Sequence, residues 1–189
     1  MSEAPLSQPL RYSWNDFIAL DEDDLRELID GELLEVEVPS ELHEHIVMRL
    51  GFFLTGWARA SDGGRVLASG YKLRVSDSRG VMPDIQYFSS ESARSVGSAG
   101  LTQGHPDLVI EVLSESSRRF DRVTKLGWYA ELGVPEYWIV DPSSCTLERL
   151  VLGEGHYVIA QALEGNALFA PPSFDGLEVP LAELWALPG

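Results

Sequence analysis

Residues 105–142, HPDLVIEVLSESSRRFDRVTKLGWYAELGVPEYWIVDP, contain the pattern that most clearly indicates the fold class. The apolar runs at 107–113 and 136–140 are typical of buried strands, and residues 116–132 between them predict a helix that Gly133 ends. A strand–helix–strand unit of this kind favours two parallel strands joined by a right-handed crossover. The stretch therefore predicts an α/β fold.

The residues before this unit predict a long helix and further strands. Residues 41–58 follow Ser40, a typical N-cap residue, and their apolar side chains recur at spacings of three and four residues. Strands are predicted at 65–75, with a break at Ser69-Gly70, and at 84–88. Together with the strand that precedes the second helix, they make three strands in succession, which favours an antiparallel meander.

Both ends of the chain predict additional structure. Residues 14–28 predict short helical pieces, because Trp14, Phe17 and Ile18, and then Leu25, Leu28 and Ile29, recur at helical spacing. GELLEVEV, residues 31–38, alternates like a half-buried strand, and residues 145–152 and 156–161 predict a hairpin. The predicted fold class is therefore a mixed β-sheet flanked by helices, in the order helix, three strands, helix, strand, with extra β-structure at both ends. A length of 189 residues suits one domain, 1–189.

The composition bears on partners and compartment. A formal net charge of −16 argues against a tight grip on DNA by phosphate neutralisation. The charge is uneven, because nine acids and one base lie between Asp21 and Glu37, whereas four bases and one acid lie between Arg118 and Lys125. Cys145, the single cysteine, cannot form an internal disulfide, so we expect a reducing cytoplasm. No stretch predicts a signal peptide or a membrane span, so we expect no membrane partner.

Two predicted strands each carry one acidic side chain among apolar neighbours. Asp84 opens a strand directly after Pro83, and Glu111 lies inside the run 107–113. Ionised carboxylates in apolar strands are costly unless they are paired or bound to metal. If the two strands are neighbours, both carboxylates can hold one Mg²⁺ ion; otherwise they are hydrogen-bonded structural groups, and spacing alone leaves both interpretations open. Asp107 lies about 13 Å from Glu111 along the strand, so it is interpreted as a strand-start residue.

The stretches VMPDIQYF (81–88) and 105–142, with IDGELLEVEVPSELHEHIV (29–47) upstream, resemble the Uma-two family of endonucleases. That family belongs to the PD-(D/E)XK restriction-endonuclease-like superfamily, and the similarity extends from about residue 12 to residue 150. The resemblance implies a restriction-endonuclease-like core and a nuclease that acts on DNA.

The resemblance also implies a set of site residues. Asp84 occupies the aspartate of the PD motif, and Glu111 occupies the D/E position. Leu113 stands where the superfamily normally has its lysine, and in this family the lysine is relocated to the following helix, where Lys125 is the only lysine. Glu115 replaces a proline that is frequent in the family, a change expected to alter the start of the helix rather than the metal site.

Several neighbouring residues keep alternative interpretations. Lys125 could instead be a solvated helix lysine that pairs with Asp121 four residues earlier. Arg118, Arg119 and Arg122 either contact phosphates or merely cover the first half of the helix.

The upstream segment offers two further candidates, Glu32 and His43, because an acid near the first helix sometimes completes such sites. His43 and His45 do not predict a zinc site, since residues i and i+2 of a helix point to different faces.

The sequence thus predicts a metal-dependent endonuclease that hydrolyses DNA phosphodiester bonds with Mg²⁺, or with Mn²⁺ as a substitute. The alternative, favoured by the net charge, is a catalytically inactive nuclease fold that serves as a binding or assembly module. The chain contains neither a G-x-S-x-G elbow nor a P-loop, which argues against another kind of hydrolase. A homodimer is also predicted, from the aromatic residues Trp128, Tyr129, Tyr137 and Trp138 and from the need to cut both strands of a duplex.

Overall fold

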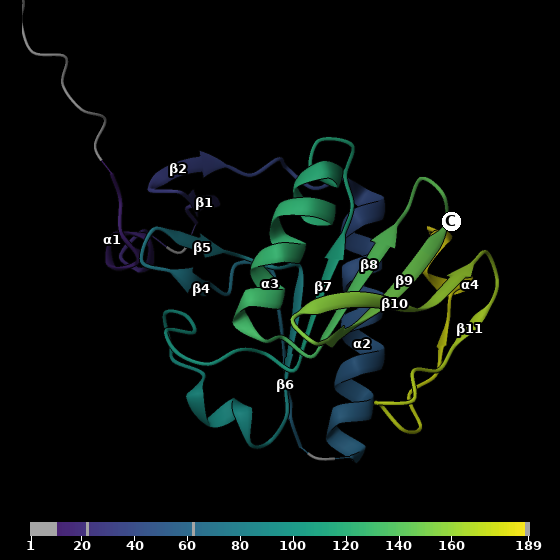
Figure 1. Ribbon diagram of the computed structural model, residues 1–189. Helices are drawn as coiled ribbons and strands as arrows, with labels where there is room; N and C mark the ends of the chain where they lie inside the picture. Colours follow the sequence, from purple (N-terminus) through teal and green to yellow (C-terminus); the bar gives the residue numbers. More distant parts are fainter. Residues whose placement is uncertain (1–10, 22, 62, 188–189) are drawn as a thin grey trace, which may run out of the picture.

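Three β-sheets organise the part of the chain that this computed structural model describes, residues 11–21, 23–61 and 63–187 (Figure 1). In chain order the elements are α1 (Trp14–Ile18), β1 (Arg26–Ile29), β2 (Glu32–Glu35), α2 (Glu41–Ala60), β3 (Arg65–Ala68), β4 (Leu73–Ser76), β5 (Arg79–Val81), β6 (Ile85–Phe88), η1 (Ser92–Ser95), β7 (Leu108–Val112), η2 (Phe120–Lys125), α3 (Leu126–Leu132), β8 (Glu136–Asp141), β9 (Thr146–Gly153), β10 (His156–Glu164), β11 (Leu168–Phe169), β12 (Val179–Pro180) and α4 (Ala182–Trp185). The mixed α/β class predicted from the sequence is confirmed.

The largest sheet has six strands among the described residues, in the order β10-β9-β8-β7-β6-β3. β3 pairs antiparallel with β6, and β6 pairs antiparallel with β7, as the predicted meander requires. β7 and β8 are parallel, as expected for two strands joined by a helical crossover. β9 and β10 form the predicted hairpin, which turns through Glu154 and Gly155 at positive φ.

Helices cover the two faces of this sheet, α2 on one and α3 on the other (Figure 1). Along β7 the side chains alternate between the two layers. Leu108 and Ile110 pack in the cluster that contains the buried face of α2, whereas Val109 packs with Tyr129 of α3. Because side chains alternate along a strand, Glu111 shares the face of Val109 and points towards α3.

The helix α2 agrees closely with its sequence pattern. Ser40 is its N-cap, and the Ser40 hydroxyl accepts a hydrogen bond from the N–H of His43 at 3.2 Å. Ile46, Leu50 and Leu54 form its buried stripe. The start of α2 is therefore fixed, and with it the place of His43.

One predicted element is wrong. Residues 14–28 were expected to form short helical pieces, the second of them marked by Leu25 and Leu28, but Arg26–Ile29 forms β1 and pairs antiparallel with β2. The two strands are joined by Asp30 and Gly31, which have φ angles of 51° and 86°. Positive φ at both central residues is the pattern of a type I′ hairpin turn, for which Asp-Gly is a favoured sequence. The helix predicted at the start of this region is present as α1.

β1 and β2 belong to a second sheet, in the order β2-β1-β5-β4, which lies beside the main sheet (Figure 1). The strand predicted at 65–75 is divided between the two sheets, because the chain leaves the main sheet after β3 and joins the smaller one as β4. β5 was not predicted. Gly80 lies at its centre because a Cβ atom there would lie only 2.6 Å from the ring of Phe17, which α1 packs against the strand.

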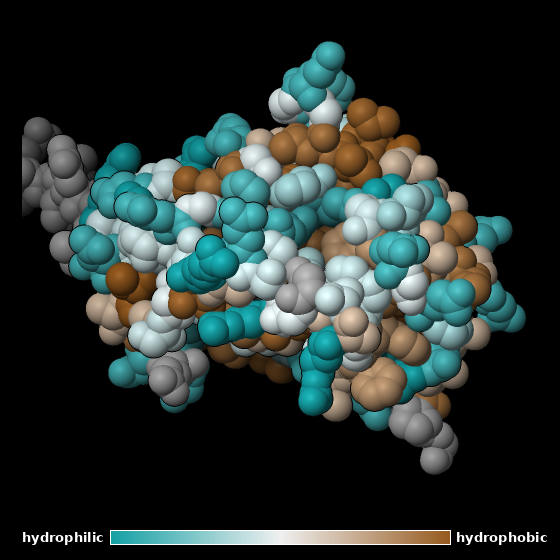
Figure 2. Space-filling view, turned by 90° about the horizontal axis from the view of Figure 1, so that it is seen from below, coloured by the Kyte–Doolittle hydropathy of each residue, from teal (hydrophilic) through white to brown (hydrophobic). Residues whose placement is uncertain are grey.

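The surface does not carry the aromatic residues on which part of the dimer prediction rested. Trp128, Tyr129, Tyr137 and Trp138 are all buried, so that basis for a homodimer is wrong. Hydrophilic side chains cover most of the face seen in Figure 2, and hydrophobic ones gather mainly at its upper edge. Within the described residues, the longest helices are too short or too polar to cross a lipid bilayer.

Candidate active site

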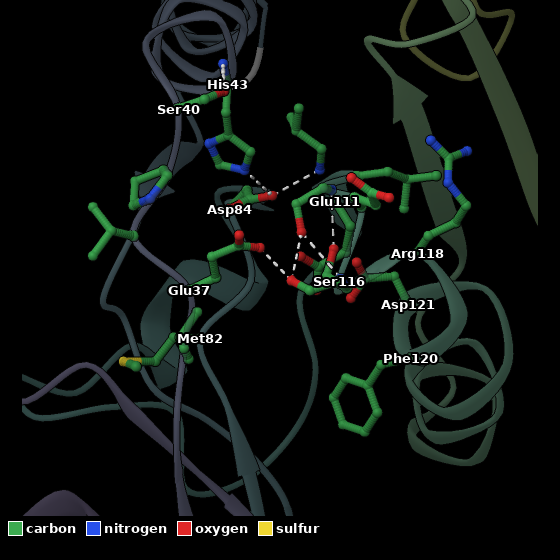
Figure 3. Close-up of a pocket in the computed structure, with 18 of the residues that line it drawn as sticks. Glu37, Ser40, His43, Met82, Asp84, Glu111, Ser116, Arg118, Phe120 and Asp121 are labelled. Carbon is green, nitrogen blue, oxygen red and sulfur yellow. Dashed lines mark hydrogen bonds and ion pairs between the residues drawn. The ribbon is translucent and has the colours of Figure 1, made fainter.

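A cleft of about 1090 Å³ lies where β7 ends and β6 begins, next to the start of α2 (Figure 3). Asp84, Glu111 and Lys125 all line it. Asp84 directly precedes Ile85, the first residue of β6, and Ile85 pairs with Ile110, the residue before Glu111 on β7. The prediction that the strands next to the two acids are hydrogen-bonded neighbours is confirmed, although Asp84 itself stands just before its strand.

Asp84 is held by two donors from different elements. Its Oδ2 accepts a hydrogen bond from the main-chain N–H of Val112 at 2.7 Å, and His43 Nε2 lies 3.2 Å from the same oxygen. Burial lowers the pKa of His43, but the hydrogen bond and charge of Asp84, with the charge of Glu44, outweigh burial and raise it above the usual value. Of the two further candidates from the upstream segment, His43 therefore contacts the site.

Glu111 is buried and is held at one oxygen. Its Oε1 accepts a hydrogen bond from the hydroxyl of Tyr129 at 2.6 Å and one from Lys125 Nζ at 3.1 Å. Burial raises the pKa of Glu111 well above its usual range; the ammonium of Lys125 acts against this rise, and the nearby carboxylates add to it. Glu111 is thus a carboxylate whose ionised form depends on neighbouring positive charge.

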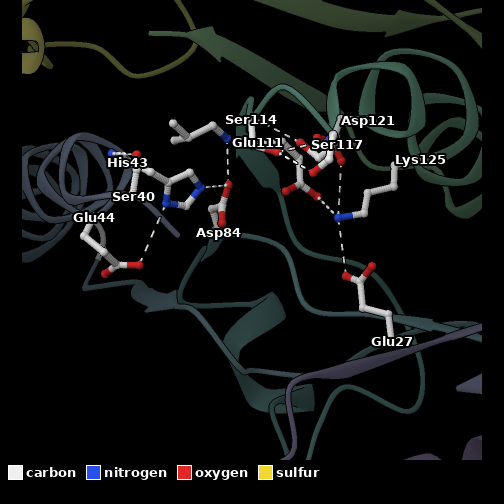
Figure 4. A network of polar contacts seen from close by, with 12 residues as sticks. Glu27, Ser40, His43, Glu44, Asp84, Glu111, Ser114, Ser117, Asp121 and Lys125 are labelled. Carbon is white, nitrogen blue, oxygen red and sulfur yellow. Dashed lines mark hydrogen bonds and ion pairs between the residues drawn. The ribbon is translucent and has the colours of Figure 1, made fainter. Parts of the chain in front are cut away.

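Lys125 lies inside the protein, with 6% of its surface exposed (Figure 4). Its ammonium lies 3.1 Å from Glu111, 3.3 Å from Glu27 and 3.4 Å from Asp121. Burial acts to lower the pKa of Lys125, but the surrounding carboxylates raise it well above its usual value, so the side chain is a cation. The interpretation of Lys125 as a solvated surface lysine is wrong, although its predicted pair with Asp121 exists.

The helix that carries Lys125 is not a regular α-helix. Residues 120–125 form a π-helical segment that leads into α3, within the range predicted as one helix. Asp121 and Lys125 are the two buried residues of this segment. π-helical turns widen a helix locally and are frequent at functional sites. Here the segment carries a buried acid and a buried base next to Glu111.

Glu27 is the residue that the sequence analysis missed. It belongs to β1, is 6% exposed, and accepts a hydrogen bond from the main-chain N–H of Met82 at 2.8 Å. In the sequence it lies within an acidic run that resembles a solvated face. Only the Asp30-Gly31 hairpin signal could have placed Glu27 on a strand, and no local pattern indicated that its side chain is buried.

The remaining sequence candidates have other roles in the structure. Glu32 is exposed and does not line the cleft, so it is not brought to the site. Arg118 lines the cleft but forms a bidentate pair with Asp141. Arg119 is exposed.

Arg122 and Asp107 are engaged outside the cleft. Arg122 pairs with Glu148 at 2.6 Å rather than facing the cleft. Asp107 accepts one hydrogen bond from the main-chain N–H of Ser89 and another from the hydroxyl of Ser92. These contacts agree with its interpretation as a strand-start residue.

The lining of the cleft is strongly acidic. Eight acidic side chains line it, and the two basic ones, Arg118 and Lys125, are both paired with carboxylates. The acidic residues are Glu27, Glu35, Glu37, Glu44, Asp84, Glu111, Glu115 and Asp121. Such an excess of negative charge favours the binding of a cation and opposes direct contact with a polyanion.

The donor set fits a magnesium ion held by few protein ligands. Among the residues that the structure describes, no three or more His, Cys, Asp or Glu side chains form a metal-binding group. Mg²⁺ commonly takes only one or two carboxylates and keeps water or substrate oxygens as its other ligands. Asp84 Oδ1 and Glu111 Oε2 accept no hydrogen bond from the described residues, while the other oxygen of each carboxylate is fixed. One oxygen of each acid is therefore available to a cation.

Comparisons with known proteins identify the family of the chain. Residues 14–182 match the Uma2 family, described as "Putative restriction endonuclease". An uncharacterized protein from Synechocystis sp. is 25% identical over 147 residues, which cover 75% of this chain and 80% of that protein. A solved structure from Anabaena variabilis, described as "a putative nuclease belonging to DUF820", has a TM-score of 0.72 at 19% identity and covers 92% of this chain and 97% of that one; at this identity the likeness supports the fold alone. Because the family match spans most of its length, this chain belongs to the Uma2 family of restriction-endonuclease-like proteins.

Proposed function

We propose that this protein is a metal-dependent endonuclease that hydrolyses DNA phosphodiester bonds. Membership of a restriction-endonuclease family supports a nuclease reaction. The observation that carries the proposal is the arrangement in one cleft of Asp84, directly before β6, and Glu111 on the neighbouring β7, with Lys125 3.1 Å from Glu111. A buried ion pair contributes little to the stability of a fold. Two acids beside it, each with an available oxygen, are suited to hold a cation.

Asp84, Glu111 and a main-chain carbonyl near Val112 would hold Mg²⁺, for which Mn²⁺ would be a substitute. The bound cation supplies Lewis-acid polarisation of a phosphate and a lowered pKa for a water molecule. Asp84 contributes a carboxylate whose direction is set by the Val112 N–H, and Glu111 one whose direction is set by Tyr129.

Lys125 would supply fixed positive charge where negative charge develops on the phosphate, or would orient the attacking water. Its position supports this role, because Glu111, Glu27 and Asp121 hold the ammonium in one place beside the two acids. The lysine acts from the π-helical segment rather than from the strand of Glu111.

The acidic lining favours a second candidate function, a catalytically inactive binding or assembly module. Both basic side chains of the lining are paired with carboxylates, so neither is available to neutralise phosphates without rearrangement. In the catalytic proposal, the cation brings the positive charge that the lining lacks. The two functions therefore differ in whether a divalent cation restores DNA binding and cleavage.

The test is a cleavage assay on supercoiled and single-stranded DNA with Mg²⁺, with Mn²⁺ and with chelator. The proposal predicts nicking or cutting with either cation, none with chelator, and none from an Asp84→Ala variant. A pure preparation that binds a divalent cation but cuts neither substrate would leave the binding module as the function. Cleavage that survives Asp84→Ala would point to a contaminant or to another site.

We further propose that the protein forms a homodimer and works in the reducing cytoplasm. Two arguments support this proposal. A two-fold dimer presents two sites to the two strands of a duplex, and the single cysteine suits a reducing compartment. A monomer in sedimentation at micromolar concentration would overturn the dimer.

A further inference from the structure

Glu27 joins two parts of the site that come from different elements. A single oxygen, Oε1, accepts a hydrogen bond from the N–H of Met82 at 2.8 Å. The same oxygen lies 3.3 Å from Lys125 Nζ (Figure 4). The side chain is 8% exposed, the same fraction as that of Lys125. Glu27 is delivered by β1 of the four-stranded sheet, whereas Lys125 is delivered by the π-helical segment.

The contact with Met82 bears on Asp84 because of the residue between them. The segment reads Met82-Pro83-Asp84, and proline has no N–H. The N–H of Met82 is therefore the last main-chain donor before Asp84, and Glu27 fixes the backbone at that point. The same oxygen thus restrains the approach to Asp84 and the ammonium of Lys125.

Neutralisation of Lys125 does not explain why Glu27 is buried. Glu111 and Asp121 already lie within 3.4 Å of the ammonium, so a third carboxylate adds negative charge without a matching cation. Burying an unmatched carboxylate is costly, and a neutral side chain would serve packing better. The position of Glu27, rather than its charge alone, must account for it.

We propose, on the basis of the proposed nuclease function, that Glu27 is a positioning residue that holds Lys125 and the Met82–Asp84 segment in register with each other. In this proposal the four-stranded sheet contributes to the reaction through β1 without touching the substrate. The loss of Glu27 releases Lys125 from its place and loosens Asp84, while the fold of the main sheet persists.

Lysine labelling tests the positional claim without any need for activity. The chain has two lysines, Lys125 and Lys72, and both are 6% exposed. Lys72 donates to the carbonyl oxygens of Phe17 and Leu20, away from Glu27, and serves as an internal control. An amine-reactive reagent, read by mass spectrometry, should label Lys125 several-fold faster in Glu27→Ala than in the native protein and should leave Lys72 protected.

Two further variants and a control complete the labelling test. Glu27→Gln keeps an acceptor oxygen at the same reach and should restore most of the protection of Lys125. Glu136→Gln removes a buried carboxylate far from Lys125 and should leave its labelling unchanged. If Glu27→Ala exposes Lys72 as well, the milder variant Glu27→Asp is labelled in its place. Glu27→Asp should expose Lys125 alone. The proposal would be overturned if Lys125 were as well protected in Glu27→Ala as in the native protein. Where Glu27→Ala exposes Lys72 as well, the same outcome in Glu27→Asp would overturn it.

Kinetics separate positioning from mere stability. Glu27→Ala should lower kcat by about 10–100-fold, the usual cost of removing an outer partner of a metal site, with KM for DNA unchanged. Glu27→Gln should recover part of kcat. An unchanged kcat in Glu27→Ala would contradict the role of Glu27 in the reaction. If the native protein cuts no DNA under any metal, the proposed function fails, and the labelling result alone still decides whether Glu27 positions Lys125.

Discussion

Two buried clusters of charged side chains lie at different places in this protein and differ in their balance. The first surrounds Glu136 of β8. Its two oxygens accept hydrogen bonds from Arg149, from the indole N–H of Trp138 and from the hydroxyl of Ser173. One guanidinium faces one carboxylate, and both carboxylate oxygens are occupied.

The second cluster surrounds Lys125 beside the cleft. One ammonium faces Glu27, Glu111 and Asp121. The Oδ1 atom of Asp121 lies 3.4 Å from that ammonium and accepts no hydrogen bond from the described residues. Asp84 adds a further negative charge next to Glu111. This cluster has more carboxylates than cations, and some of its oxygens remain available.

The difference indicates which cluster supports the fold and which awaits a ligand. A buried pair that is neutral and fully hydrogen-bonded is a structural element, whereas a buried excess of one charge is tolerated where it performs a function. Glu136 and Arg149 are buried, and so are Lys125 and the three carboxylates around it, so burial alone would not distinguish the two groups. The charge balance does.

The sharpest contrast should come from removing an acid from each cluster. Asp84→Ala should abolish divalent-cation binding and cleavage, and should cost little stability in metal-free buffer, because relieved carboxylate repulsion offsets the lost hydrogen bonds to Val112 and His43. Glu136→Ala should instead cost about 3–5 kcal/mol of stability, because it leaves the buried Arg149 unpaired, and should keep cation binding. Calorimetric titration and thermal unfolding measure both effects. A Glu136→Ala variant that is no less stable than Asp84→Ala in metal-free buffer would contradict this difference between the clusters.

Removing the ammonium comes next in size. Lys125→Ala should lower turnover by orders of magnitude and leave cation affinity intact, since a cation is not a metal ligand. From the sequence we would also expect nearly intact folding. The burial of Lys125 against three carboxylates instead predicts that the variant loses about 3–5 kcal/mol of its free energy of unfolding in metal-free buffer. A divalent cation should restore part of that loss in urea unfolding. An active Lys125→Ala enzyme would remove lysine from the proposed reaction.

A single hydroxyl offers a smaller change. Tyr129→Phe removes the 2.6 Å hydrogen bond to Glu111 and should reduce kcat by about tenfold, the lower end for an outer partner of a metal site. Tyr157→Phe is the matched control, because its hydroxyl donates to the carbonyl of Val134 at 2.7 Å, away from the cleft. Both variants should lose about 1–3 kcal/mol of stability. Equal kcat values in the two variants would show that Tyr129 only stabilises the fold.

The smallest effect concerns the histidine beside Asp84. His43 should titrate above its usual pKa of 6.5, because Asp84 and Glu44 outweigh burial, and NMR should show this pKa falling in Asp84→Asn. A raised pKa means that the His43 contact contributes stability that is full below pH 6.5 and is lost as pH rises through the folded-state pKa. A native His43 that titrates at or below 6.5 would separate His43 from Asp84.

The sequence allowed the core of the fold to be predicted but not the whole site. The 105–142 stretch predicted two parallel strands and a helix correctly because its apolar runs are long and its helix ends at Gly133. Residues 25–29 misled because three apolar residues in a short segment fit either a helix or a strand, and the Asp-Gly turn was the deciding signal. Glu27 could not be predicted, since its burial depends on the packing of two separate sheets.

The most direct test of the account is calorimetric titration of Mn²⁺ into three proteins, the native chain, Asp84→Asn and Glu136→Gln. Each substitution removes one carboxylate charge with little change in volume, one beside the cleft and one in the balanced cluster. We expect a binding event in the native chain that persists in Glu136→Gln and disappears in Asp84→Asn. Equal binding in all three proteins, or none in the native chain, would contradict the assignment of the unbalanced cluster as a cation site.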